Sequence, residues 1–170
     1  VNCGGYSSEL LVKTPSNLNS QLIRQIVLGV IENDIYLEMA VKEELDRPDK
    51  TLPQEVLDIL KVGVYQKFFM SSIPDYAIVS ESLKSCEYFG VENYKGLVNS
   101  ILRKIDHSAI EKKISNMPSV NDRLKVKYSV GDNFYDFLIE NYKIKTIRKI
   151  LESYVKVPDL VIRINSSKTS

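Results

Sequence analysis

Hydrophobic residues recur every three or four positions along most of this chain, a spacing that predicts amphipathic α-helices. The first such run follows Asn19 and Ser20, either of which offers an N-cap. The residues of this run that share one face are Leu22, Ile23, Ile26, Val27, Val30 and Ile31. A second helix is predicted over 35–45, and Pro48 interrupts the pattern after it.

Residues 53–105 contain three further helices, and the rest of the chain is organised around them. In the first of the three, Gly63 lies within the apolar stretch and indicates a close helix crossing, because glycine lets a neighbouring backbone approach. Thr51 and Gln54 have the spacing of a capping box, with Pro53 in the first turn. The inward positions are Val56, Leu57, Leu60, Val64 and Phe68.

The second helix of this stretch opens at Pro74 and ends at Gly90, a residue type that commonly follows a helix C-terminus. Its predicted core positions are Ala77, Val79, Leu83 and Cys86. The third helix is predicted over 92–105, with Val98, Ile101, Leu102 and Ile105 inward. Lys95, Asn99 and Arg103 recur every four residues on another face of it.

After residue 105 the helical pattern is shorter and less regular. Short helices are predicted over 109–117, 119–128, 134–142 and 144–154. In the last of them Ile147, Ile150, Leu151 and Tyr154 share one face, opposite Lys145, Arg148 and Lys149. Residues 160–165 alternate in polarity and predict one β-strand, which would need a continuation to pair with. The predicted fold class is all-α: a helical domain over 1–106, then a helical linker and one terminal strand over 107–170.

Composition narrows the class of protein. With 170 residues and 44% hydrophobic content, the chain is long enough to bury a core. No apolar run is long enough to span a bilayer, so no membrane partner is expected. The two cysteines, Cys3 and Cys86, indicate a reduced cytoplasmic setting and, with His107 alone, match no zinc-site spacing. The start at Val1 suggests a fragment of a longer protein.

Charge is unevenly distributed. Residues 1–106 carry 11 Lys/Arg and 15 Asp/Glu, a net −4, whereas residues 107–170 carry 12 and 7, a net +5. The second half is therefore the better candidate for a surface that binds a polyanion. A soluble domain with uneven surface charge explains the same numbers.

Motifs for chemistry are missing from the sequence. No G-x-G follows an apolar strand, and no P-loop occurs, so no cofactor-binding residue is predicted. Cys86 is expected to be a buried small hydrophobe, and His107 a surface residue. Glu81 is expected to be a solvated carboxylate or to pair with Lys84 or Lys104. The alternative is a partly buried acceptor that ties its helix to that of Asn99, or a contact with a partner. No catalytic residue and no metal ligand is predicted.

Four segments of the middle stretch, taken in order, resemble a known family. They are LKVGVYQKFF (60–69), IP (73–74), AIVSESL (77–83) and GLVNSILRKI (96–105). They are similar to the NusB-type helical RNA-binding domain, whose pattern is L-R-x-G-x-Y-Q-L-x-F, x-I-P, A-V-N-E-A-V and F-V-N-x-V-L-R. Ser80 stands where that family has asparagine. The resemblance implies an all-α bundle.

The 65 residues after Ile105 separate two groups that share this domain. Free-standing transcription antitermination factors end soon after the V-N-x-V-L-R helix. Sun/Fmu-type rRNA cytosine-C5 methyltransferases continue through a linker into an L-R-V-N-x-x-K-T strand, which LVIRINSSKT (160–169) resembles. GGYS (4–7) also resembles the G-x-Y-S end of their first helix, which suggests that this helix is trimmed. VGD (130–132) departs from their H-P-x-W.

The second group implies that the parent protein is an S-adenosylmethionine-dependent 16S rRNA methyltransferase. A cysteine thiolate of its catalytic domain attacks C6 of cytosine, and the methyl group moves to C5. The cofactor loop and catalytic cysteines would follow Ser170, and neither Cys3 nor Cys86 matches them. This chain would then bind and orient RNA without transferring a methyl group.

Basic residues of both halves, together with one asparagine, are the candidate RNA contacts. They are Arg24, Lys95, Arg103, Lys104, Lys145, Arg148, Lys149, Arg163 and Asn165. The predicted partners are 16S rRNA and the absent catalytic domain. Two alternatives stay open: a free-standing antitermination factor that binds RNA, and a helical protein-interaction module that never touches RNA. The acidic first half favours the latter.

Overall fold

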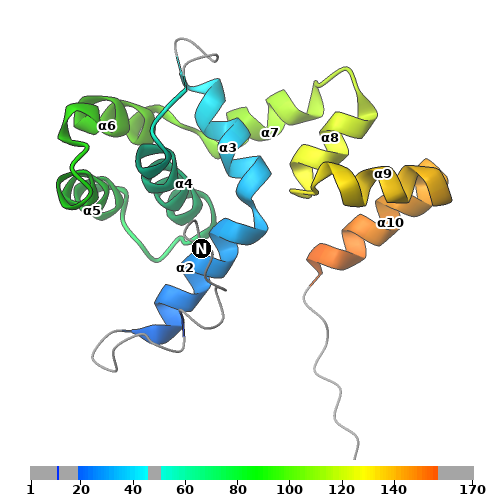
Figure 1. Ribbon diagram of the computed structural model, residues 1–170, viewed down its shortest axis with the longest axis horizontal. Coiled ribbons are helices and arrows are strands. Elements are labelled where there is room, and N and C mark those ends of the chain that lie inside the picture. Colours follow the sequence, from blue (N-terminus) through cyan, green and yellow to red (C-terminus); the bar gives the residue numbers. More distant parts are fainter. Residues whose placement is uncertain (1–10, 12–18, 46–50, 157–170) are drawn as a thin grey trace, which may run out of the picture. The chain divides into compact units, whose positions relative to one another are not determined.

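The computed structural model describes residues 11, 19–45 and 51–156, where the regular elements are all helical (Figure 1). The all-α prediction is confirmed. The helices are α2 Ser20–Glu32, α3 Asp34–Glu43, α4 Gln54–Phe69, α5 Asp75–Tyr88, the 3-10 helix η1 Glu92–Tyr94, α6 Lys95–Lys104, α7 His107–Ser115, α8 Val120–Lys127, α9 Asp132–Asn141 and α10 Ile144–Val155. By contacts the chain forms two compact units, Val1–Gly131 and Asp132–Ser170, which are described separately.

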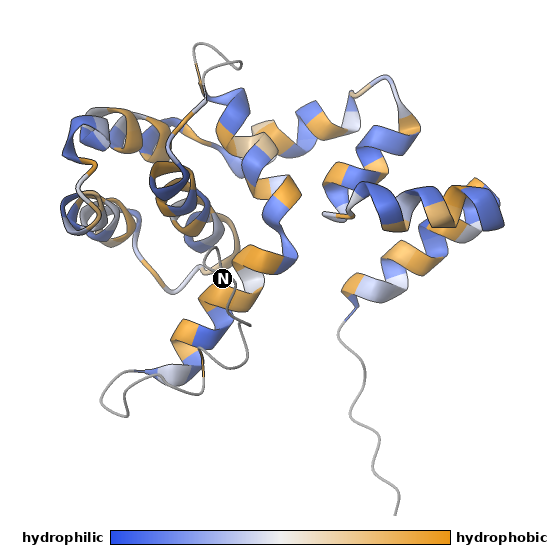
Figure 2. Ribbon diagram, in the orientation of Figure 1, coloured by the Kyte–Doolittle hydropathy of each residue, from blue (hydrophilic) through white to orange (hydrophobic). Residues whose placement is uncertain are grey.

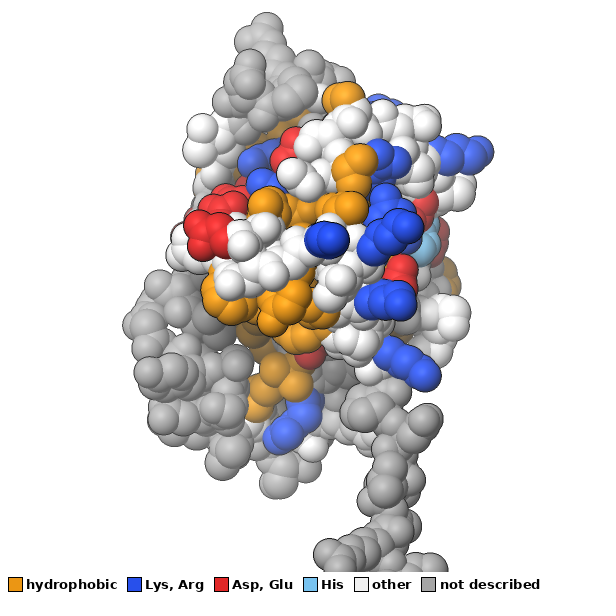
Figure 3. Space-filling view, turned by 90° about the vertical axis from the view of Figure 1, so that its right-hand side faces the viewer, with side chains coloured by type: hydrophobic (Ala, Val, Ile, Leu, Met, Phe, Trp, Pro, Cys, Tyr) orange, Lys and Arg blue, Asp and Glu red, His pale blue; other side chains and the backbone are white. Residues whose placement is uncertain are grey.

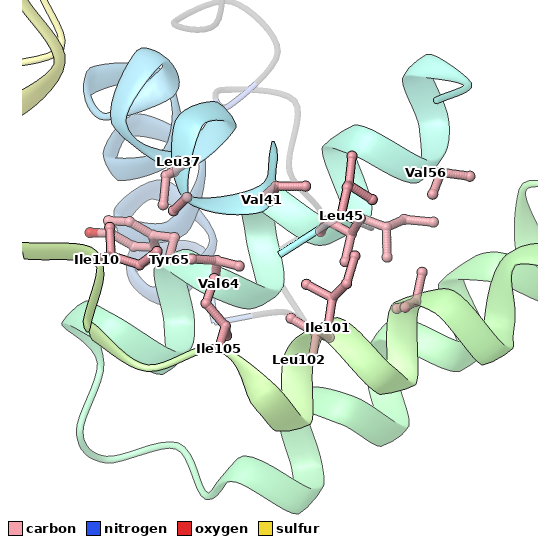
Figure 4. Close-up of a cluster of buried hydrophobic side chains, with 14 of the residues drawn as sticks. Leu37, Val41, Leu45, Val56, Val64, Tyr65, Ile101, Leu102, Ile105 and Ile110 are labelled. Atoms are coloured by element: carbon pink, nitrogen blue, oxygen red, sulfur yellow. The ribbon is translucent and has the colours of Figure 1, made fainter. Parts of the chain in front are cut away.

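Helix α4 is the centre of the first unit, where it packs against α2, α3, α5 and α6. Its Val56, Leu60 and Val64 are fully buried. Figure 4 labels Val56 and Val64 within a cluster of buried side chains that also includes Val41 of α3 and Ile101 of α6. The predicted close crossing at Gly63 is confirmed, because a β-carbon there would lie 2.8 Å from a methyl group of Leu102. The group that approaches is a side chain of α6, rather than a backbone.

Local signals set several helix ends. The Asn19 side chain accepts a hydrogen bond from the Leu22 amide at 3.1 Å, and Ser119 accepts one from the Asp122 amide at 3.2 Å, so both predicted caps are confirmed. Gly90 ends α5 with φ +69°, and the next amide donates to the Cys86 carbonyl at 2.9 Å. Asp106 caps α7, which the sequence pattern had not indicated.

Three local expectations were wrong. Helix α4 begins at Gln54 with Pro53 as the N-cap, so Gln54 is too early to complete a capping box, and its side-chain amide donates to the Asp58 carboxylate instead. The helix predicted over 92–105 is divided into η1 and α6. In α5, Ile78 and Ser82 are buried with Val79 and Cys86, whereas Ala77 and Leu83 are only partly covered.

A buried lysine joins α3 to α4. The Lys61 residue is 4% exposed, and its ammonium donates to Asp34 at 2.7 Å and Glu38 at 2.9 Å. Burial favours the neutral amine, but the hydrogen bonds to Asp34 and Glu38, together with the negative charges of these two carboxylates, outweigh it and raise the pKa of Lys61. Lys61 stands at the arginine position of the L-R-x-G motif, so the motif carries a structural ion pair here.

The first unit continues past residue 106 through α7 and α8. Helix α8 packs against α3 and α7, and the Ile35 amide donates to the Ser129 hydroxyl at 2.9 Å. The domain division predicted at residue 106 stays a prediction.

The second unit contains the helical pair α9 and α10, whose buried residues are Tyr135, Leu138, Ile147 and Leu151. Hydrophobic and hydrophilic positions alternate along α10 (Figure 2). Tyr154, which was predicted to share a face with Ile147 and Leu151, is 73% exposed at the end of α10. Among the helices that the structure describes, none combines the length and apolar character needed to cross a membrane.

Candidate nucleic-acid interface

The end of α6 is held by a lysine from α4. The last carbonyls of a helix have no partner within the helix, and cations are favoured beside them. Lys67 reaches across from α4, donates to the Leu102 carbonyl at 2.8 Å, and lies 3.4 Å from the Asp75 carboxylate. The three helices therefore meet at one polar point. Sequence reasoning missed this role, although Lys67 replaces the leucine of the family motif.

A hollow of about 450 Å³ lies where α5 begins and α6 ends. Its lining residues are Asp75, Tyr76, Val79, Leu102 and Arg103. Val79 and Leu102 are buried, whereas the Tyr76 residue is 77% exposed. The sequence did not predict an exposed aromatic ring beside a small hollow, because Tyr76 is not part of any of the motifs that were recognised.

Arg103 brings a positive charge to the same hollow. Its Nε donates to the Asn99 side-chain oxygen at 2.8 Å, which orients the guanidinium and leaves its remaining N–H groups available. Within the described ranges no carboxylate pairs with Arg103. The four-residue spacing of Asn99 and Arg103, noted in the sequence, thus becomes a side-chain contact that prepares an arginine for an anion.

The other predicted cations of the first unit are differently placed. Lys95 pairs with Glu87, and Lys104 lies 3.1 Å from the Glu44 carboxylate. Arg24 is exposed on α2, whereas the other three lie on α6. Arg103 is therefore the α6 cation with its charge uncompensated by a described carboxylate.

In the second unit, Lys145, Arg148 and Lys149 are all exposed on α10, as predicted. Their spacing of three and four residues places them on neighbouring turns of one face. Large hydrophobic side chains are exposed in this unit too, and Figure 3 shows hydrophobic side chains gathered on the viewed face with Lys and Arg beside them.

Some predictions fall outside the described residues. They concern Arg163, Asn165, Cys3 and the strand over 160–165.

The other candidate residues have structural roles. Glu81 pairs with Lys84 at 2.7 Å on the surface, one of the predicted pairings. Cys86 is fully buried, and burial raises the pKa of its thiol. His107 is half-exposed, and its ring stacks on Phe68 with centroids 4.6 Å apart. None of these contacts resembles a nucleophile beside its base.

Comparison with known proteins supports the resemblance seen in the motifs. A family model described as the NusB family matches residues 5–107. "Probable ribosomal RNA small subunit methyltransferase B" of Bacillus subtilis (strain 168) is 24% identical over 156 residues, which are 90% of this chain and 34% of that protein. "Ribosomal RNA small subunit methyltransferase B" of Pasteurella multocida (strain Pm70) is 26% identical over 98% of this chain and 36% of that protein.

A shorter relative matches less of this chain. "Transcription antitermination protein NusB" of Caldicellulosiruptor saccharolyticus (strain ATCC 43494 / DSM 8903 / Tp8T 6331) is 26% identical over 89 residues, which are 52% of this chain and 68% of that protein. This chain spans about a third of the length of the methyltransferase relatives. No solved structure matches it. Since the family model covers more than half of the chain and the fold is all-α, the chain belongs to the NusB family.

Proposed function

We propose that this chain is the RNA-binding N-terminal region of an S-adenosylmethionine-dependent 16S rRNA cytosine-C5 methyltransferase. The observation that carries the proposal is the extent of the matches. Two methyltransferase relatives align with 90% and 98% of the chain, whereas the antitermination relative aligns with 52%. Residues beyond the NusB match at 5–107 therefore have counterparts in the methyltransferases.

The geometry agrees with a binding role. Arg103 is exposed and oriented by Asn99, and α10 carries three exposed cations on neighbouring turns. Contacts of this kind bind phosphates and position RNA without reading its bases. In this proposal the chain binds rRNA in the cytoplasm and holds it beside the catalytic domain, so that the target base and the catalytic groups are correctly oriented.

Methyl transfer is assigned to the catalytic domain. A cofactor such as S-adenosylmethionine could approach a glycine only where its backbone is uncovered. Among the described residues, the two buried glycines are both covered, Gly29 by the Tyr65 ring and Gly63 by the Leu102 side chain. Cys86 is unsuited as a nucleophile, since its thiol is buried and its pKa is raised. No step of the reaction is assigned to this chain.

A free-standing antitermination factor is the second candidate. It is favoured by the match of the antitermination relative, which covers 68% of that protein. Both candidates bind RNA, so they differ in which RNA is preferred. The third, a protein-interaction module, predicts no RNA affinity.

Titration of labelled small-subunit rRNA fragments at several salt concentrations tests the proposal. The logarithm of the binding constant should fall linearly with the logarithm of salt concentration, with a slope of about −0.7 per phosphate contact on single strands. Replacing Lys145, Arg148 and Lys149 together by glutamine should flatten that slope. Lys84→Gln, which removes an exposed cation paired with Glu81, is the control and should leave the slope unchanged.

Three outcomes would contradict the proposal. Absence of binding at low salt would favour the protein-interaction module. Preference for a transcript-leader RNA over an rRNA fragment of equal length would favour the antitermination factor. Methyl transfer by this chain alone would show that it contains catalytic residues of its own.

A further inference from the structure

We propose that the hollow at the α5 and α6 ends holds one unpaired RNA nucleotide whose base carries an exocyclic amino group. The inference rests on the proposed function and extends it, because it names a site and a class of base. Its residues are Tyr76 for the base, Arg103 for the phosphate and Asp75 for the amino group.

Shape and size support a single nucleotide. The volume of about 450 Å³ lies within the range of about 300–1,000 Å³ that is usual for small-ligand pockets. The apolar lining comes from Val79 and Leu102, which are 7% and 1% exposed. Helices α5 and α6 pack directly on each other (Figure 1). Lys67 ties the end of α6 to Asp75. The hollow is thus built on packed helices.

Tyr76 supplies an unoccupied ring. It is 77% exposed at the rim, and no ring or hydrogen-bond partner contacts it within the described ranges. An exposed tyrosine with no contact on its ring can stack on an unpaired base through its π-face. Bases of an A-form duplex are already stacked, and their major-groove edges are inaccessible to side chains. The ring therefore selects an unpaired base.

The charges on the hollow are separated in a way that fits a nucleotide. Arg103 and Asp75 both line it, yet they form no ion pair in the described structure. The guanidinium, held by Asn99, presents N–H donors that match a phosphate. The Asp75 side chain is 70% exposed, and the Lys67 ammonium lies 3.4 Å from its Oδ2, so the carboxylate keeps lone pairs that face solvent and can accept further hydrogen bonds.

A carboxylate acceptor discriminates between bases. Cytosine, adenine and guanine each carry an exocyclic amino donor on the Watson–Crick edge. Uracil has one N–H there, with a carbonyl oxygen on each side that a carboxylate repels. Cytidylate is therefore expected to bind more tightly than uridylate.

Fluorescence anisotropy with fluorescein-labelled oligocytidylate and oligouridylate of equal length tests this site in the full chain. The wild-type chain should bind oligocytidylate more tightly. Tyr76→Ala should weaken its binding at least about fivefold, as expected when one stacked base is lost, while Tyr76→Phe keeps the affinity. Asp75→Asn should reduce the ratio of the affinities for oligocytidylate and oligouridylate, because the side-chain amide of asparagine can also donate a hydrogen bond to a uracil carbonyl.

Two further variants separate the hollow from general binding. Arg103→Gln should weaken both oligonucleotides and lower the magnitude of the salt slope by about 0.7. Tyr88→Ala removes a tyrosine that is 85% exposed at the other end of α5, outside the hollow, and should change nothing. Because Tyr76 and Tyr88 are both largely exposed, neither substitution disturbs the core.

The outcomes distinguish this site from the proposed function. If the wild-type chain binds RNA with a salt-dependent affinity but Tyr76→Ala binds both oligonucleotides as tightly, the hollow is not the site. Equal affinity for both oligonucleotides overturns the base preference. If the wild-type chain binds neither oligonucleotide nor rRNA fragments at low salt, the proposed function fails together with it.

Discussion

The hydroxyl end of Tyr65 lies against the backbone of Gly29, where a β-carbon would come within 2.0 Å of the Tyr65 oxygen. Gly29 is the buried residue of α2, and Tyr65, 8% exposed, belongs to α4. The two helices pack together here because glycine leaves room for the ring. Tyr65 in turn packs on Phe69, with centroids 5.3 Å apart, so the ring has little freedom to move.

Gly29→Ala is therefore expected to destabilise the first unit by about 1–3 kcal/mol, the usual cost of overpacking a core. Urea unfolding followed by circular dichroism measures the change. Gly96→Ala is the matched control, because a β-carbon built there meets no packing neighbour within 4 Å beyond its own stretch of helix, and alanine is the better helix former. It should be neutral or stabilising by up to about 1 kcal/mol. Equal effects of the two would contradict this account of the crossing.

The buried Lys61 predicts an asymmetry between its partners. Lys61→Met leaves the Asp34 and Glu38 side chains, which are 53% and 33% exposed, to be solvated by water, so the cost should be only about 1–2 kcal/mol. Replacing both partners, Asp34→Asn with Glu38→Gln, leaves the buried ammonium without a countercharge, which typically costs about 3–5 kcal/mol. The urea concentrations at the midpoint of unfolding measure the loss of stability in the Lys61→Met variant and in the double variant. A larger loss for Lys61→Met would show that Lys61 is solvated in solution.

Acid should weaken the same contact between α3 and α4. Hydrogen bonds from Lys42 and Lys61 hold the pKa of Glu38 below its ordinary value of 4.5. Because the folded pKa lies below the unfolded one, the stabilisation is complete above about pH 4.5 and is lost as the pH falls through the folded value. In an unfolding series from neutral pH into this range, Glu38→Gln should flatten the acid loss. Lys42→Gln, which removes one donor, should have an intermediate slope.

The contact of Asn99 with Arg103 predicts an effect on RNA affinity. In Asn99→Asp, the new carboxylate pairs with the guanidinium and adds a negative charge, so the salt slope of RNA binding should shrink by up to about 0.7. Asn99→Ala removes the hydrogen bond but keeps the charge of Arg103, and should have the smaller effect. Anisotropy titrations measure both. An unchanged slope in Asn99→Asp would mean that Arg103 contacts no phosphate.

Cys86 should be protected from alkylation in the folded chain. Its side chain is fully buried, and burial raises the pKa of the thiol, so little reactive thiolate reaches solvent. In a Cys3→Ser background, iodoacetamide should modify Cys86 slowly in buffer and rapidly in urea, as followed by mass spectrometry. Rapid modification in buffer would indicate that α5 opens locally.

Much of the helical layout could be predicted from the residues alone. The apolar positions of α4, the caps at Asn19 and Ser119, and the stop at Gly90 depend on contacts within one or two helical turns. The basic face of α10 followed from helical periodicity in the same way. Periodicity placed Tyr154 on the same face as Ile147 and Leu151, but burial also requires a neighbouring element, and Tyr154 is exposed while the other two are buried.

The sequence by itself determined the fold class, the family and the candidate cations, since motif order and residue spacing carry that information. Only the tertiary structure decided which cations are available. It buried Lys61 between two carboxylates, used Lys67 at the end of α6, paired Lys95 and Lys104 with glutamates, and left Arg103 beside Tyr76. The physical reason is that charge compensation acts between side chains on different helices. Their proximity depends on how the helices pack.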